Sequence, residues 1–449
     1  MPVTFADAFR VWTKIGLLSF GGPAGQIALM HKILVEEKKW VDEDRFLHAL
    51  NYCMLLPGPE AQQLAIYIGW LLHRVKGGLA AGILFVLPGA AVMLVLSILY
   101  AAFGQFTITQ AVFFGIKAAV LAVVVEAILR IGKRALKNSL MYVIAACSFV
   151  GIFLFDVSFP LIVIAAGLIG FIVYKITPQM LPPSQPHGTQ KMSTGAVTTI
   201  VETETSLHSR PSLSRALKVT VVCMALWLLP IVAMAIWLGA GNVYVQEGVF
   251  FSKMAVVTFG GAYAVLAYMA QQAVDTYGWL EPGEMLDGLG LAETTPGPLI
   301  MVVQFVGFLG AYRNPGLLDP MLAGTLGGLL ATWVTFVPCF LWIFLGAPYV
   351  ESLRGNQALS AALSAITAAV VGVILNLSIW FALHVMFGTV NEVPAFGATL
   401  QVPEFATLEP GALVLTVAAL TAMLRYKVGM LTTLAVSTLL GTVYLLVLK

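Results

Sequence analysis

The chain has 449 residues, of which 59% are hydrophobic and only 10% are charged, with a mean hydropathy of +0.92. This composition excludes a soluble protein and indicates an all-α polytopic membrane protein. The net charge of +2 gives no reason to expect a nucleic-acid partner. The four cysteines lie in apolar stretches without metal-ligand spacing, so we expect free thiols, no metal site and no cofactor.

Apolar segments follow one another along the chain. In the first part they span 9–35, 46–73, 77–103, 108–131, 139–155 and 157–176. A stretch rich in Pro, Ser, Thr and Gln follows at 177–215, where the absence of apolar periodicity predicts a disordered cytoplasmic linker. One apolar segment at 216–239 then precedes six more, at 247–275, 286–312, 321–350, 357–388, 409–424 and 428–448.

The two groups of six segments resemble each other. Phe20-Gly21-Gly22 recurs 239 residues later as Phe259-Gly260-Gly261, and each motif follows a lysine, Lys14 or Lys253, by the same number of residues. At the same interval, Pro57-Gly58-Pro59 matches Pro296-Gly297-Pro298. Two motifs and a lysine at one fixed interval predict an internal repeat.

The repeat defines the expected domains. They are a first transporter repeat over 1–176, the linker 177–215, a connecting transmembrane helix over 216–239 and a second repeat over 240–449. Six segments return the chain to its starting side, and the single connecting helix then crosses the membrane. We therefore expect two inverted-topology repeats whose broken or re-entrant helices meet at the membrane midplane.

The charges of the loops refine this topology. The loop between the first two segments is basic and contains Lys32, Lys38, Lys39 and Arg45. The positive-inside rule places such a loop in the cytoplasm. It lies there only if each of the first two segments is a re-entrant hairpin. The matching loop at 275–295 has no Lys or Arg and is expected outside. Full crossing of these segments is the alternative. Both arrangements place the N-terminus in the cytoplasm and the C-terminus outside.

The glycine and proline motifs interrupt helices and begin new ones. Pro23, Pro59 and Pro298 stand at a suitable first helical position, where the missing N–H would have no partner anyway. Free N–H groups and the positive end of the helix dipole at such starts bind anions. The expected substrate-binding residues are these motifs with nearby polar side chains: Lys14, Ser19, Phe20, Gly21, Gly22, Pro23, Gln26, Pro57, Gly58, Pro59, Gln62, Lys253, Thr258, Phe259, Gly260, Gly261, Thr295, Pro296, Gly297 and Pro298.

Several of these features have structural interpretations. Glycine pairs also allow close helix packing, and Lys14 could reach the membrane interface. Glu60 and Glu293 flank the Pro-Gly-Pro motifs, and Lys117 lies in the middle of an apolar segment, so all three are candidates for coupling transport to protons. Glu126 and Arg130, four residues apart, are expected to form a structural ion pair.

The combination of Lys14, Ser19-Phe20-Gly21-Gly22-Pro23 and Leu56-Pro57-Gly58-Pro59 with the second-half motifs resembles the chromate transporter family, in its long two-domain form. The resemblance covers nearly the whole chain apart from the linker. It implies chromate efflux, chromate resistance and a bacterial inner membrane, with sulfate as a related substrate. The chain departs from the family pattern at Ala262, where many second halves have glycine, and at Ala267, where they often have proline.

The sequence therefore predicts a secondary active transporter of a tetrahedral oxyanion, most simply chromate, embedded in a lipid bilayer. A sulfate-type anion exchanger that also carries chromate is the alternative, and a homodimer is left open. A membrane-embedded enzyme acting on lipid phosphate is a further hypothesis. Against it, the sequence lacks His-Glu-x-x-His, an aspartate-rich metal motif and a nucleotide-binding loop.

Overall fold

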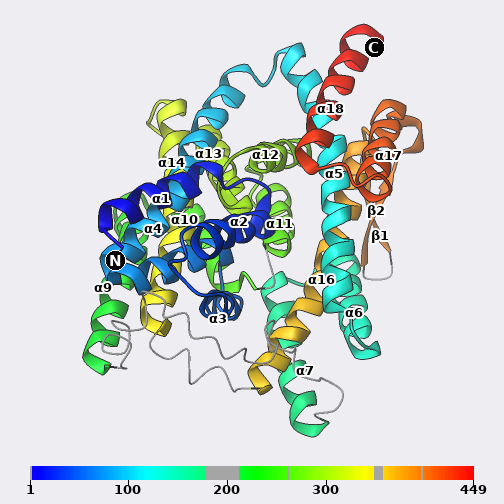
Figure 1. The fold of residues 1–449 in the computed structure, drawn as a ribbon. Coiled ribbons are helices and arrows are strands. Elements are labelled where there is room, and N and C mark those ends of the chain that lie inside the picture. The colour runs from blue at the N-terminus through cyan, green and yellow to red at the C-terminus, as the bar shows by residue number, and fades with distance from the viewer. Residues whose placement is uncertain (1–2, 178–211, 260–261, 348–356, 396–397, 449) are drawn as a thin grey trace. The chain divides into compact units, whose positions relative to one another are not determined.

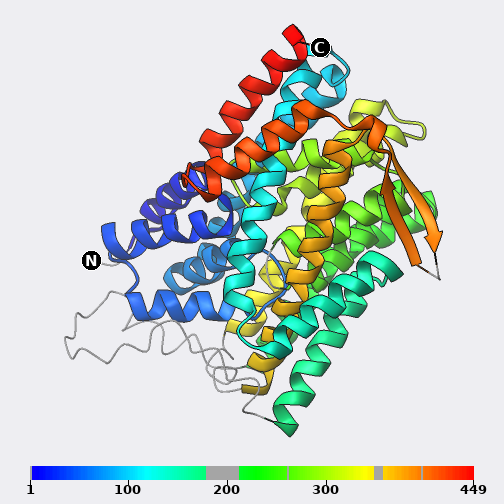
Figure 2. The ribbon, with the colours of Figure 1, turned by 90° about the vertical axis from the view of Figure 1, so that its right-hand side faces the viewer.

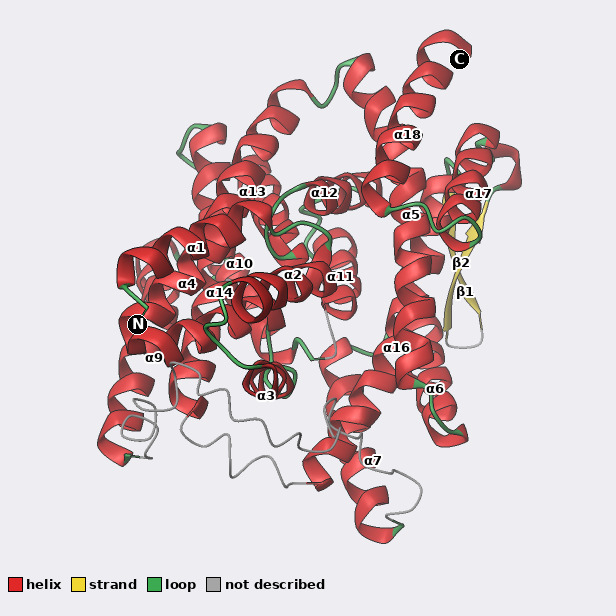
Figure 3. Cartoon of the chain, viewed as in Figure 1, coloured by secondary structure: helices red, strands yellow, loops and turns green. Residues whose placement is uncertain are grey.

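The computed structural model is almost entirely helical, and helices account for nearly every element in Figures 1 and 3. It describes the chain except residues 1–2, 178–211, 260–261, 348–356, 396–397 and 449. Most of the expected linker, 177–215, and Gly260 and Gly261 therefore lie outside the described residues. Within the described part, seven helices are long and apolar enough to cross a membrane, which confirms the prediction of an all-α polytopic membrane protein.

The residues divide into two compact units, each of which draws on both halves of the sequence. The first unit contains residues 1–94, 183–261 and 295–357. Its helices are α1 (Phe5–Leu18), α2 (Gly22–His31), η1 (Lys32–Glu37), α3 (Glu43–Cys53), most of α4 (Glu60–Phe103), α9 (Leu213–Leu238), α10 (Val243–Val257), η4 (Leu299–Met301), α13 (Val302–Arg313) and α14 (Pro320–Gly346).

The second unit contains residues 95–182, 262–294 and 358–449. Its elements are α5 (Thr107–Ala135), α6 (Ser139–Phe155), α7 (Phe159–Ile176), α11 (Ala262–Gln271), η3 (Gln272–Thr276), α12 (Pro282–Thr294), α16 (Gln357–Met386), β1 (Val390–Ala395), β2 (Ala398–Pro403), η6 (Phe405–Thr407), α17 (Pro410–Leu424), α18 (Met430–Val443) and η7 (Tyr444–Leu448).

The helices before and after each expected break are short. α1 has 14 residues, α3 has 11 and α10 has 15, whereas a membrane span needs about 20 residues. The long helix α4 is itself interrupted by non-helical backbone at His73 and Arg74, at the expected boundary between two apolar segments. These lengths agree with broken helices. Whether each broken pair turns back or crosses the membrane, and on which side each loop lies, stay predictions.

Small residues let the helices of the second unit approach closely. α5 packs against α17 and α18, which lie beside it in Figure 2. A Cβ at Gly115 of α5 would lie 2.2 Å from the carbonyl oxygen of Ser437 on α18, so only glycine permits this crossing. Between the apolar segments 357–388 and 409–424, β1 pairs with antiparallel β2.

Candidate functional site

The first helix break in the first unit has the backbone form that its sequence predicts. α1 ends at Leu18, and Gly21 and Gly22 adopt left-handed φ values of +86° and +68°. Glycine reaches this region without the steric cost that a side chain brings. α2 begins immediately afterwards, with Pro23 in its first turn. The space around both glycines is open, so the start of a ten-residue helix is not covered by the unit itself.

Each Pro-Gly-Pro motif is bonded to the helix break of the opposite half of the sequence. The N–H of Gly297 donates to the carbonyl oxygen of Ser19 at 2.7 Å, and the N–H of Gly58 donates to that of Thr258 at 2.9 Å. Both pairs belong to the first unit. Gly58 and Gly297 occupy matching positions of the repeat, as do Ser19 and Thr258. The two bonds are therefore a reciprocal pair, and each places a Pro-Gly-Pro motif beside the helix break of the other half.

The glycines of these motifs are required for the close fit. Gly58 and Gly297 have φ values of +115° and +104°, which side-chain-bearing residues rarely adopt. A Cβ at Gly89 on α4 would lie 2.3 Å from the carbonyl oxygen of Pro296. At the first Pro-Gly-Pro motif, a Cβ at Gly58 would lie 3.2 Å from Sγ of Cys339 on α14. Pro57 is half-buried, whereas Pro296, Gly297 and Pro298 are fully buried.

Four buried glutamines surround these turns. Three of them donate from Nε2 to backbone carbonyl oxygens: Gln26 to Gly297, Gln63 to Pro57 at 2.6 Å, and Gln304 to Ala90 at 3.0 Å. Each is completely buried. The bonds of Gln26 and Gln63 each join a helix side chain to the backbone of a Pro-Gly-Pro turn and so help to hold that turn in position. The bond of Gln304 joins α13 to the backbone of α4.

The fourth glutamine, Gln62, is different. It lies in the first turn of α4, after Pro59 and the half-buried Glu60, and its side chain is completely buried. Neither Oε1 nor Nε2 has a hydrogen-bond partner among the described residues. A buried amide without partners costs free energy, so such a group in a native protein calls for an explanation. A ligand at the start of α4 would supply one, because the helix N–H groups and the Gln62 amide both offer donors.

Most of the other expected site residues also belong to the first unit. Ser19 and Thr258 are buried and donate from their hydroxyl groups to the carbonyl oxygens of Ile15 and Met254 four residues earlier. Thr295 is buried, and Phe20 is 37% exposed. Lys14 and Lys253 both project from the exposed sides of α1 and α10. Neither lysine forms an ion pair within the described part of the chain.

The remaining coupling candidates lie in the second unit. Glu293 on α12 is 4% exposed and accepts a 2.8 Å hydrogen bond from the hydroxyl of Tyr263 on α11. Lys117 on α5 lies 3.3 Å from the carboxylate of Asp287. Asp287 falls in the loop 275–295 that the sequence places outside, and the sequence analysis missed this pairing. Its position within the apolar run Met285–Leu291 was a signal that it is buried. The expected ion pair between Glu126 and Arg130 is also present.

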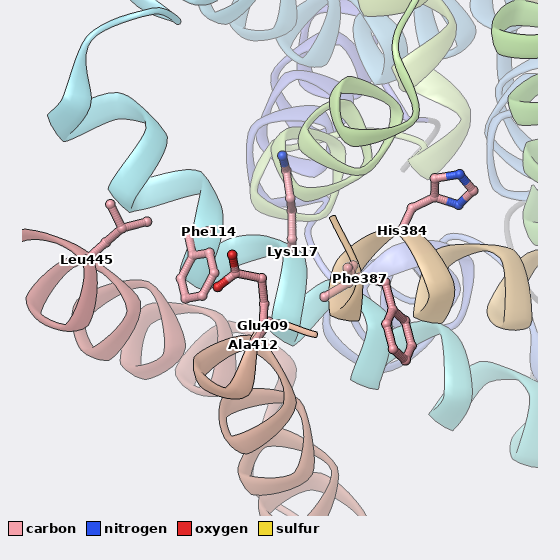
Figure 4. A pocket seen from close by; sticks show the side chains of 8 residues that line it. Phe114, Lys117, His384, Phe387, Glu409, Ala412 and Leu445 are labelled. Carbon is pink, nitrogen blue, oxygen red and sulfur yellow. The ribbon is translucent and has the colours of Figure 1, made fainter. Parts of the chain in front are cut away.

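Two cavities in the second unit meet at Lys117. The first cavity has a volume of about 370 Å³, and the residues that line it include Tyr100, Lys117, Glu284 and Asp287. The second, of about 200 Å³, is lined by Lys117, His384 and Glu409 with apolar side chains, as Figure 4 shows. The hydroxyl of Tyr100 donates to Asp287 at 2.8 Å, so Asp287 has two partners. The larger cavity has three carboxylates, Glu281, Glu284 and Asp287, against the single cation Lys117, so it is less suited to a divalent anion than the turns of the first unit. In the smaller cavity Lys117 is accompanied by the carboxylate of Glu409.

Comparison with known proteins gives a consistent result. The family model described as "Chromate transporter" matches residues 6–171 and 245–442. The chain is 32% identical over 385 residues to a chromate transport protein of Pseudomonas aeruginosa, covering 83% of this chain and 80% of that protein. It is 28% identical over 372 residues to a chromate transport protein of Cupriavidus metallidurans, covering 83% and 81%. An uncharacterized transporter of Methanocaldococcus jannaschii is 26% identical, covering 84% and 85%. No solved structure matches the chain.

Proposed function

The chain belongs to the chromate transporter family, and we propose that it transports chromate across the membrane as a secondary active efflux carrier. Chromate is a divalent tetrahedral oxyanion. Two relatives, 28% and 32% identical to this chain, are named chromate transport proteins. The efflux direction and a role in chromate resistance are parts of the same proposal. The multi-pass character of the chain fits this function.

The observation that carries the proposal is the reciprocal bonding of the helix breaks. The bonds Gly297–Ser19 and Gly58–Thr258 bring together turns from both halves of the sequence. Helices α2 and α4 begin next to these turns, and each has a proline at or just before its first residues. Helix starts in a low-dielectric surrounding provide N–H donors and positive potential without a mobile side chain. An oxyanion with four acceptor oxygens is a suitable ligand for such donors.

The dipole ends need additional positive charge. Each contributes about half an elementary charge, whereas chromate carries two negative charges that must leave water. Lys14 lies one turn before Ser19, and Lys253 lies one turn before Thr258. We propose that these lysines complete the neutralisation when the substrate is bound. Their exposure within the first unit leaves both ammonium groups available to a ligand.

Transport assays in everted membrane vesicles test the proposal. Radiolabelled chromate should accumulate in vesicles that contain the protein, and a proton gradient should change the rate. Unlabelled sulfate should compete with chromate for uptake if the site recognises double negative charge and tetrahedral shape. Unlabelled chloride serves as the control anion. Chromate accumulation no faster than in vesicles without the protein would contradict the proposed function. Equal or faster transport of sulfate in the absence of chromate would favour the sulfate exchanger instead.

A further inference from the structure

A glutamate outside the proposed anion site lies at a close helix crossing of the first unit. Glu247, on α10, is completely buried. A Cβ at Gly327 of α14 would lie 2.9 Å from Oε2 of Glu247, 2.5 Å from Cβ of Ala311 and 2.5 Å from the carbonyl oxygen of Gly307 on α13. The Glu247 carboxyl group thus occupies space that exists only because residue 327 is glycine.

The Glu247 carboxyl has nothing to neutralise a negative charge. Neither of its oxygens has a hydrogen-bond partner among the described residues. The backbone of Ala311 lies near the carboxyl, outside hydrogen-bonding geometry, and it supplies no counter-charge. An isolated carboxylate in such surroundings carries a large desolvation cost, and the group takes up a proton instead. Burial without a counter-charge therefore favours the neutral, protonated form of Glu247 in this conformation.

The surrounding elements do not supply a counter-charge. Tyr244, one turn earlier on α10, is the titratable group that interacts with the Glu247 carboxyl. α14 has no charged residue along its length, and α13 has Tyr312 and Arg313 only at its exposed end. On α9 the titratable or charged groups are Arg215, Lys218 and Cys223. No ion pair joins any of these groups to Glu247 in the described part of the chain.

The sequence repeat shows that the fold does not need an acid at this position. The residue that matches Glu247 at the interval of 239 is Ala8 on α1, which is also buried. The first half therefore fills the corresponding place with a methyl group. A carboxylic acid in the second half adds a costly polar group to a position that alanine can fill, which points to a function other than packing.

We propose that Glu247 is a proton-binding site that couples substrate transport to proton movement, an inference that rests on the proposed transport function. The carboxyl holds one proton while α10, α13 and α14 are packed as in this structure. A rearrangement that separates Gly327 from α10 admits water, and the acid then dissociates into a carboxylate and a proton released to that water. Reprotonation precedes the return to the packed state. The binding of one proton is thus tied to one conformation of the helices.

Proteoliposomes that contain a trapped pH-sensitive dye test this inference. Chromate flux and proton flux are recorded together, and chromate exchange with the same concentration on both sides is recorded separately. In Glu247→Gln the amide keeps the size and neutrality of the protonated acid but cannot release a proton. We expect the chromate-linked proton signal to fall at least about tenfold while chromate exchange persists. Glu404→Gln, at an exposed glutamate, is the matched control and should retain both signals.

The outcomes separate the two proposals. Absence of chromate movement in the parent protein would overturn the proposed function. Chromate movement with an unchanged proton-to-chromate ratio in Glu247→Gln would overturn the role of Glu247 alone. If Glu247→Gln does not fold, Glu247→Ala provides the second variant, since alanine occupies the matching position in the first half. A chromate-linked proton signal in folded Glu247→Ala would likewise contradict the inference.

Discussion

The backbone N–H of Gly297 donates a 2.7 Å hydrogen bond to the carbonyl oxygen of Ser19, across 278 positions of the chain. Its counterpart, from Gly58 to Thr258, repeats the same arrangement with the halves exchanged. Each half therefore supplies a turn to the helix break of the other. Neither half of the sequence therefore forms this arrangement of turns and helix breaks by itself. A substitution at Gly58 or Gly297 should affect elements from both halves.

Gly297→Ala should impair transport strongly. A side chain at a φ of +104° costs about 1–2 kcal/mol, and Cβ would lie 3.3 Å from Cα of Gly89. The control is Gly316→Ala, at a φ of +60° with no neighbouring atom within 4 Å. We expect both variants to lose thermal stability and only Gly297→Ala to lose chromate uptake per inserted molecule. Equal uptake by the two variants would show that the close approach to Gly89 is not needed for function.

Gln62→Leu should separate stability from function. The Gln62 amide is buried without partners, so an apolar side chain of similar size removes an unsatisfied group and should leave stability unchanged or raise it by about 1 kcal/mol. If the amide donates to substrate, chromate uptake should nevertheless fall. Gln63→Leu is the comparison, because it removes the bond to Pro57 and should lower stability. Normal uptake by Gln62→Leu would place the anion away from the start of α4.

Lys14→Met and Lys253→Met should each reduce chromate transport strongly, because each removes one positive charge close to a helix break and keeps much of the apolar stem. Lys218→Met, at an exposed lysine of α9, is the control and should transport normally. Arginine should rescue only in part, since its planar guanidinium differs in shape from a compact ammonium. Initial uptake rates, normalised to protein in the membrane, give the measurement. If both methionine variants take up chromate at the parental rate, the lysines are not needed, and the anion must be bound by backbone N–H groups and side-chain amides.

The inverted topology predicts opposite labelling of two matched loops. Cysteines are introduced singly at Lys38 and Thr276, and an impermeant maleimide is applied to intact cells and to everted vesicles. Native thiols must be removed first, above all the exposed Cys147. We expect the cysteine at position 276 to react in cells and the cysteine at position 38 to react only in everted vesicles. Reaction of both from the same side would refute the inverted repeat.

Asp275, near the end of η3, should make the stability of the protein depend on pH. Burial, followed by the charges of Glu392 and Asp156, raises the pKa of Asp275 from 3.8 to about 6. Between these values the folded chain binds more protons than the unfolded chain, so stability falls as pH rises through this window. Neighbouring groups bury Asp275 only in part, and its side chain stays accessible to solvent, which screens the charge. We therefore expect the apparent Tm of Asp275→Asn at pH 7 to exceed that of the parent by no more than about 2–4 °C.

The two proteins should melt alike well below pH 4, where Asp275 is protonated in both the folded and the unfolded state. Asp44→Asn, at another exposed aspartate, is the control for removal of a charge in general. A difference in Tm between Asp275→Asn and the parent that stays constant from pH 4 to pH 7 would contradict the assignment to titration of Asp275.

The sequence by itself determined the class of the protein and the location of its helix breaks. Apolar segments of helical length are visible without tertiary contacts, and the left-handed backbone at Gly21 and Gly22 follows from a Gly-Gly pair before proline. The apolar segment expected at 216–239 overlaps helix α9, Leu213–Leu238. These features are local, because hydrophobicity and backbone preference belong to single residues and their immediate neighbours.

Only the tertiary structure decided which turn meets which break, and which polar side chains remain without partners. The bond from Gly297 to Ser19 and the ion pair between Lys117 and Asp287 join residues far apart in sequence. Gln26, Gln62 and Gln63 look equivalent in the sequence, yet only Gln62 has an amide without any partner in the described chain. Whether a polar group is satisfied depends on distance and direction to groups on other helices. For the same reason the buried acid Glu247 could not be distinguished from an ordinary charged residue until α14 was seen to pack against it.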